Sequence, residues 1–160
     1  SVINNGKGGK DMLLGEFNHT LDNKNRVSVP ASMRAELGAD FMVVRSLRGQ
    51  CLRVFSKPAW DAYVEPLKHK DRKISEPTLW YLYHDAMQTT PDSLGRIRIS
   101  KELLSFIGVN PDETCADRNV ELVVVGCGDY SEIWAKENYE AHVSGMDMEA
   151  IVRALEESGL

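Results

Sequence analysis

The chain has 160 residues, of which 42% are apolar and 27% charged, and its formal net charge at pH 7 is −5. This composition excludes a disordered or collagen-like chain, and the longest apolar run is far shorter than the roughly 20 residues that a membrane-spanning helix needs. A chain of this length can bury a core as one compact domain or as two half-size units.

Residues 1–11 are rich in Gly, Asn and Lys and contain no hydrophobic segment, so we expect a disordered leader or a cloning remnant there. Patterned sequence begins at Met12 and predicts a first half-unit over residues 12–64. A short strand runs into the turn at Asp22, and a second strand follows it. Beyond it the pattern predicts a short helix between Pro30 and Gly38, a hairpin of two strands (41–45 and one ending at 55), and a helix over 60–64.

Residues 65–86 are predicted to link the first half-unit to a second one. Ser75-Glu76-Pro77 is typical of a helix start, and apolar residues follow at helical spacing as far as Met87. The basic run at 68–73 lacks interleaved aromatic residues, which favours a solvated loop. The second half-unit, residues 87–143, repeats the order of the first, with Ser100 suited to cap its short helix. Residues 144–160 predict a tail helix with Met148, Ile151, Val152 and Leu155 on one face.

An internal repeat organises these elements. Residues 20–29 align with residues 90–99 at a displacement of 70, with Thr, Asp and Arg identical in both copies. After an insertion around residues 110–118 the displacement becomes 79, and residues 54–64 align with 133–143. We therefore predict an α+β fold of two pseudo-repeated half-units whose strands intertwine into a small barrel-like core flanked by helices.

Each half-unit carries one D-x-x-x-R turn, Asp22–Arg26 or Asp92–Arg96, which can be interpreted in two ways. In a structural interpretation the aspartate accepts backbone hydrogen bonds and pairs with the arginine, which holds a hairpin together. In a functional interpretation the cations and amides of Asn23, Lys24, Asn25 and Arg26 donate to DNA phosphates and to guanine edges. Arg34 and Arg45 add positive charge to the same half.

The charge distribution along the chain is compatible with DNA binding by the first half-unit. Residues 17–64 carry seven cations and four carboxylates, whereas residues 87–143 carry five cations and ten carboxylates. Because the Debye length is about 8 Å at physiological salt, distant carboxylates barely weaken a local basic surface. The negative net charge of the whole chain therefore makes a nucleic-acid partner less expected but does not exclude one.

Signals of catalysis or metal binding are absent from the sequence. The three cysteines form no C-x-x-C pair, the four histidines have no metal-ligand spacing, and no G-x-S-x-G nucleophile elbow is present. We therefore predict no enzyme, catalytic residue, metal, cofactor or small-molecule ligand.

Three segments together carry a family resemblance. They are G-E-F-N-H-T-L-D-N-K-N-R-V-S-V-P from Gly15 to Pro30, D-S-L-G-R from Asp92 to Arg96, and V-G-C-G-D-Y-S-E-I-W from Val125 to Trp134. The chain resembles the MraZ family of bacterial transcriptional regulators, which have tandem SpoVT/AbrB-like half-domains. The resemblance extends over residues 12–143. This sequence differs from the family pattern at Asn25, where glycine is usual, and at Leu104, where arginine is common. Asn25 can still adopt the left-handed conformation that a glycine there would take.

The resemblance implies a cytoplasmic, nucleoid-associated protein that binds double-stranded DNA at direct repeats in the promoter of the division and cell-wall gene cluster. It also implies a homo-oligomeric ring without membrane attachment. Carried over to this sequence, the DNA-facing loops are the two D-x-x-x-R turns, with Lys24 and Arg26 as the principal contacts and Arg96 as their counterpart. The alternative from another class is an antitoxin-like protein-interaction module, since the same half-fold serves both.

Overall fold

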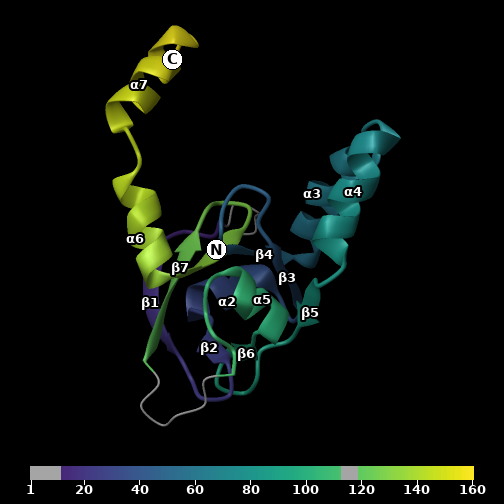
Figure 1. The fold of residues 1–160 in the computed structure, drawn as a ribbon, viewed down its shortest axis with the longest axis vertical. Helices are drawn as coiled ribbons and strands as arrows, with labels where there is room; N and C mark the ends of the chain where they lie inside the picture. Colours follow the sequence, from purple (N-terminus) through teal and green to yellow (C-terminus); the bar gives the residue numbers. More distant parts are fainter. Residues whose placement is uncertain (1–11, 113–118) are drawn as a thin grey trace, which may run out of the picture.

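The computed structural model describes residues 12–112 and 119–160. The expected leader, residues 1–11, and residues 113–118, which belong to the expected insertion, lie outside the described residues. In the described part the chain is α+β, with a six-stranded antiparallel sheet, a two-stranded ribbon and six helices (Figure 1). None of these helices has the length and apolarity needed to cross a membrane.

The six-stranded sheet has the order β1-β7-β8-β4-β3-β5. Its edge strands, β1 and β5, do not pair with each other in the described residues, so the sheet is open there and the expected barrel-like core is not a closed barrel. Alternation along a strand indicates which face is buried, but not which edges meet. The strands are β1 (Glu16–Leu21), β3 (Phe41–Arg45), β4 (Leu52–Ser56), β5 (Met87–Thr89), β7 (Val120–Gly126) and β8 (Ser131–Ala135).

Strands from the two halves of the chain pair with each other. Strand β1 pairs with β7, placing Phe17 opposite Val124, and β5 pairs with β3, placing Met87 opposite Val43. The separate ribbon joins β2 (Arg26–Ser28) to β6 (Arg96–Arg98). The strands are thus intertwined as expected, whereas the equivalence of the two halves as copies of one fold stays a prediction.

The main core lies between the sheet, the ribbon and two short helices, α2 (Ala31–Leu37) and α5 (Lys101–Phe106). The Ser100 hydroxyl accepts the backbone N–H of Leu103 at 3.3 Å, so this residue caps α5 as its sequence position predicts. Pro30 precedes α2 at its N-cap position. The core residues with at most 1% exposure include Phe41, Ile97, Leu104 and Leu122.

A second, smaller core joins helices α3 (Lys57–Lys68) and α4 (Arg72–Tyr83) to the sheet. Helix α4 begins earlier than predicted, because the Asp71 carboxylate accepts the N–H of Lys73 at 3.3 Å and caps the helix there. The basic run at 68–73 is correspondingly not one loop: only 69–71 separate the helices. The predicted helical stripe also ended too late, since Met87 starts β5.

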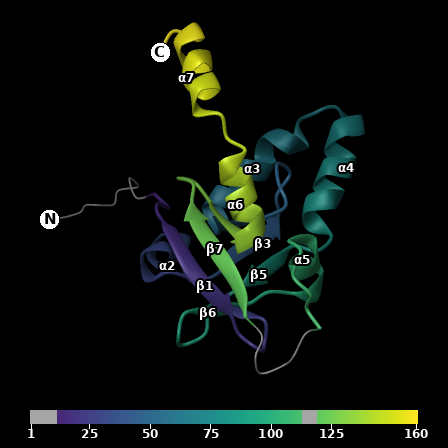
Figure 2. The same ribbon diagram turned by 60° about the vertical axis from the view of Figure 1, so that its left-hand side comes forward.

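The predicted tail helix is present as α7 (Met148–Glu157), which follows α6 (Lys136–Ser144) after three residues. Helix α6 contacts β7 and β8, whereas α7 has no buried residue and stands clear of the sheet (Figure 2). Both views place α7 at the end of the molecule opposite the β2–β6 ribbon.

Candidate nucleic-acid interface

The two D-x-x-x-R turns have the same hydrogen-bond network. In the first, Asp22 Oδ1 accepts the backbone N–H groups of Lys24 and Arg26 at 2.9 and 2.8 Å. In the second, Asp92 Oδ1 accepts those of Leu94 and Arg96 at 3.0 and 2.9 Å. Each aspartate thus satisfies the backbone of its own turn, as the structural interpretation predicted.

The arginines pair with these same aspartates. Arg26 Nε donates to Asp22 Oδ2 at 2.7 Å, and Arg96 Nε donates to Asp92 Oδ2 at 3.0 Å. In the described part of the chain, the hydrogen bond and the ion pair of the Arg26 guanidinium both run through Nε, and the side chain keeps 25% of its exposure. The structural interpretation of the arginine, pairing with Asp22, therefore holds. The N–H groups on its two terminal nitrogens are donors that a ligand could use.

The β2–β6 ribbon fixes the two turns relative to each other. Val27 lies opposite Ile97, and both are buried. The pairing continues into the turns, because Val29 N–H donates to Gly95 O and Ile99 N–H donates to Asn25 O, each at 2.9 Å. Arg96 Nη1 lies 3.8 Å from Asp22 Oδ2, which joins the two ion pairs. The ribbon therefore presents both turns as one surface.

Each turn needs a left-handed residue immediately before its arginine. Asn25 has φ of 61° and Gly95 has φ of 79°. Asparagine tolerates this region better than other residues with a Cβ, so its replacement of the usual glycine is accommodated as expected. The Asn25 amide also donates to Pro111 O at 3.3 Å, which ties the first turn to the segment after α5.

Gly95 is required for a second reason, the close approach of Arg34. A Cβ built on Gly95 would lie 1.6 Å from Arg34 Nη1, the atom that donates to Val29 O at 2.9 Å. Arg34 therefore supports the second turn from the side. Arg45 lies elsewhere: its Nε is 2.6 Å from Asp85 Oδ2, and its guanidinium is 4.9 Å from the centre of the Phe106 ring.

We expect Gly95→Ala to destabilise the protein by about 2–3 kcal/mol, from a left-handed backbone penalty and the loss of the Arg34 hydrogen bond. Gly38→Ala is the matched control, because Gly38 also has a positive φ (86°) but has no atom within 4 Å of its Cβ position. Urea unfolding of both variants checks the difference. Equal losses of unfolding free energy in the two variants would show that Arg34 moves aside from residue 95 without an energetic cost.

A shallow hollow of about 380 Å³ lies beside the first turn. Its cationic lining comes from Lys24 of the turn, Arg98 of β6 and Lys101 of α5. Asp112 lies within 2.9 Å of Lys101 Nζ and neutralises one of these charges. Arg98 and Lys101 were missed in the sequence, although alternation along β6 placed Arg98 on the face opposite the buried Ile97. Leu94 occupies the second turn with 68% exposure and offers no donor from its side chain.

The aspartates of both turns are held in their charged form. Desolvation raises the pKa of Asp22, but hydrogen bonds from the backbone of Arg26 and Lys24 and from the Arg26 guanidinium outweigh it and lower the pKa overall. The backbone N–H of Arg96 is the largest cause of the lowered pKa of Asp92. Carboxylates with lowered folded-state pKa values stabilise the fold at neutral pH and lose that contribution as the pH falls below about 4.

A metal-holding cluster and an activated thiol are not found in the described residues. No three His, Cys, Asp or Glu side chains within residues 12–112 and 119–160 are grouped so that they could hold a metal ion. Burial raises the pKa of the Cys51 thiol to about 12 and that of Cys127 to about 11, so neither thiol has the lowered pKa of a nucleophile.

The open sheet and the two turns joined by one ribbon define an α+β protein in which strands from the two halves of the chain pair around a common core. Comparison with known proteins identifies its family. The model of the family described as "MraZ protein, putative antitoxin-like" matches residues 12–78. This chain belongs to the MraZ family, as its sequence resemblance indicated.

Full-length relatives support this membership. The transcriptional regulator MraZ of Clostridium acetobutylicum is 31% identical over 156 residues, which cover 93% of this chain and 100% of that protein. The proteins of the same name from Lachnoclostridium phytofermentans and Pediococcus pentosaceus are each 34% identical, over 93% and 81% of this chain and over 99% and 85% of their own lengths.

Proposed function

We propose that this protein is a transcriptional regulator that binds double-stranded DNA through its two D-x-x-x-R turns. The observation that carries the proposal is the β2–β6 ribbon, which presents both turns together with their arginines. Side chains on a two-stranded ribbon of this kind can reach base edges in the major groove. In this proposal Lys24 and Arg26 are the principal contacts, Asn23 and Asn25 of the same turn lie beside them in the interface, and Arg96 is their counterpart in the second turn.

The local charge supports the proposal despite the acidic chain. Around the ribbon there are five cations and three carboxylates. Each carboxylate is paired with one of the cations, so the surface keeps an excess of positive charge. Donation to phosphates from the remaining groups positions the protein on DNA, and the Arg26 fork supplies base recognition. The cations are Lys24, Arg26, Arg96, Arg98 and Lys101, and the carboxylates are Asp22, Asp92 and Asp112.

The family resemblance supplies the finer features of the proposal. The target is the set of direct repeats in the promoter of the division and cell-wall gene cluster, bound at the nucleoid in the cytoplasm. The half-units 12–64 and 87–143 supply one turn each. A homo-oligomeric ring gains avidity of about 10² to 10⁴ by engaging successive repeats, which compensates for a weak single contact. No catalysis, metal or cofactor enters this function.

A gel-shift titration on the protein's own upstream DNA across a salt series tests the proposal. Each phosphate contact contributes about −0.9 to the slope of log K against log salt, so about three to five contacts per subunit give a slope of about −2.7 to −4.5 per bound subunit. Scrambled DNA of the same length is the control and should bind at least about 10³-fold more weakly. Equal binding of both DNAs, or a slope near zero, would contradict it.

An antitoxin-like role remains the second candidate because the matching family description contains that term. In that role the chain binds a single protein at fixed stoichiometry. A pull-down that recovers one stoichiometric partner, combined with no sequence-specific shift of upstream DNA, would favour it over the regulator.

A further inference from the structure

The segment that follows α5 lies against the hollow beside the first turn. Asp112 Oδ1 is 2.9 Å from Lys101 Nζ, and Pro111 O accepts a hydrogen bond from the Asn25 amide at 3.3 Å. Of the described residues that line this hollow, all the other charged ones are cations. The protein therefore holds one carboxylate inside a surface that is otherwise positively charged.

Two cations of the hollow are available to a ligand. Lys24 and Arg98 are exposed, and within residues 12–112 and 119–160 neither side chain makes an ion pair or a hydrogen bond. Arg98 is directly opposite Arg26 in the β2–β6 ribbon, and side chains that are directly opposite in an antiparallel pair project to the same face. The hollow therefore continues the surface on which Arg26 lies.

The sequence repeat shows that these charges belong to the second half alone. In the alignment at a displacement of 70, Arg98 corresponds to Ser28. Lys101 corresponds to Ala31 in the same alignment, so neither cation recurs in the first half. Asp112 falls in the insertion and has no counterpart there either. The two cations and the carboxylate are thus additions of the second half that meet at the first turn.

The backbone of Asp112 is held in place, whereas its side chain is held weakly. Val109 N–H donates to Leu104 O at 2.9 Å, which fixes the chain where it leaves α5. The N–H of Asp112 donates to Asn110 Oδ1 at 3.0 Å, the bond of an Asx turn. The side chains of Asp112 and Lys101 keep 72% and 67% of their exposure, and ion pairs as exposed as this one are weak. Another anion can therefore replace the carboxylate at Lys101 while the fold stays as it is.

A backbone phosphate of DNA is the anion that fits this surface. Phosphates follow one another along each strand of a duplex, so a turn that reaches base edges brings neighbouring phosphates to the cations beside it. The hollow places Lys101 beside the first turn in this way. A phosphate that approaches Lys101 also approaches the Asp112 carboxylate, and the two anions repel each other. DNA and Asp112 therefore compete for the same lysine.

We propose that Asp112 is a built-in competitor of DNA: without DNA its carboxylate occupies the Lys101 end of the hollow, and a backbone phosphate displaces it on binding. The inference rests on the proposed function and deepens it by naming a residue that lowers the affinity. Because phosphates carry no sequence information, the competition weakens binding to every DNA by about the same factor. Discrimination between sequences is left to the base contacts of Arg26.

Fluorescence anisotropy of the full chain with a one-repeat operator duplex and with scrambled DNA tests the proposal. Asp112→Asn removes the competing charge and keeps the shape of the side chain. At low salt it is expected to raise the affinity for both DNAs about fivefold, the factor that corresponds to two unit charges about 4 Å apart in water. The gain is expected to shrink as added salt screens the charges.

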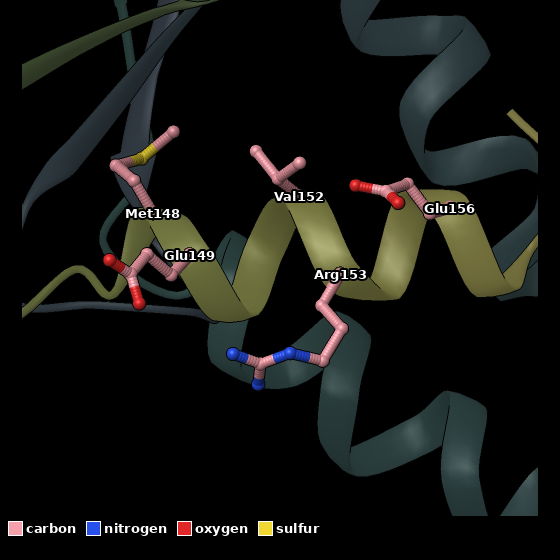
Figure 3. A pocket seen from close by; sticks show the side chains of 5 residues that line it. All are labelled: Met148, Glu149, Val152, Arg153 and Glu156. Atoms are coloured by element: carbon pink, nitrogen blue, oxygen red, sulfur yellow. The ribbon is translucent and has the colours of Figure 1, made fainter.

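Glu156→Gln is the matched control, because it changes the net charge by the same amount at the end of the molecule opposite the ribbon (Figures 1 and 2). Figure 3 shows the Glu156 side chain on α7, on a different side of the helix from Arg153. This variant is expected to bind both DNAs with wild-type affinity.

Lys101→Ala tests the other member of the pair. It is expected to lower the affinity for both DNAs and to reduce the magnitude of the salt slope by about 0.9, because one phosphate contact is lost. Wild-type affinity in Asp112→Asn or in Lys101→Ala, or an equal gain in Glu156→Gln, would overturn the proposal and leave the proposed function intact. A wild type that does not prefer the operator to scrambled DNA would instead overturn the proposed function, and this proposal with it.

Discussion

Replacing Arg26 by alanine is expected to lower affinity for a single operator repeat about 5- to 150-fold, because a bidentate arginine–guanine contact contributes about 1–3 kcal/mol. Fluorescence anisotropy with a labelled one-repeat duplex measures this loss. On DNA with several repeats the loss of affinity is larger, because every subunit that binds at the same time lacks the arginine contact. Specific binding to the natural upstream region is therefore expected to disappear.

The fold should survive this substitution. Asp22 keeps both of its backbone hydrogen bonds, to the N–H groups of Lys24 and residue 26, when the side chain is shortened. The ion pair that is lost is partly exposed, and such pairs contribute about 1 kcal/mol or less. The thermal midpoint of the variant is therefore expected to change by only a few degrees.

Two further variants separate the roles of the arginine. Arg26→Lys keeps the charge but not the planar fork, so it should retain non-specific, salt-sensitive binding and lose discrimination between operator and scrambled DNA. Arg96→Ala is expected to have the smaller effect, because Leu94 stands in its turn where Lys24 stands in the first. Full operator affinity in Arg26→Ala would contradict the assignment, and an unfolded variant would make the arginine purely structural.

Local chemistry explains why the turns could be predicted from the sequence. Aspartate at the start of the turn, a left-handed residue before the arginine and a cap at Ser100 each act within four residues, so the residue types alone determine their geometry. The structure reproduces all three, with Asn25 at a φ of 61° and the Ser100 hydroxyl bonded to Leu103.

Features that depend on distant segments could not be predicted in the same way. Arg98 reaches the first turn only because β2 and β6 pair with Arg26 opposite Arg98, and this register joins residues 72 positions apart. The open sheet depends likewise on which strand edges meet. The start of α4 was missed for a local reason: Ser75-Glu76-Pro77 suggested a cap, but the Asp71 carboxylate caps the helix one turn earlier.

Leu104→Ala is expected to destabilise the protein by about 2–5 kcal/mol, the range for removing a fully buried leucine side chain. Leu104 is fully buried in the main core, on the helix that follows the second turn. In the repeat it occupies the position of Arg34, which packs on the second turn. Leu104 therefore fills the hydrophobic core at the position where the first half has Arg34, which hydrogen-bonds Val29 O and packs against Gly95.

Urea unfolding compares this variant with Leu94→Ala, which makes the same chemical change at a side chain with 68% exposure. The control is expected to change the free energy of unfolding by less than about 0.5 kcal/mol. At temperatures where Leu104→Ala remains folded, its operator affinity should equal that of the wild type, because the ribbon and its cations are untouched. A Leu104→Ala variant of normal stability and reduced affinity would mean that α5, and not only the turns, contacts DNA.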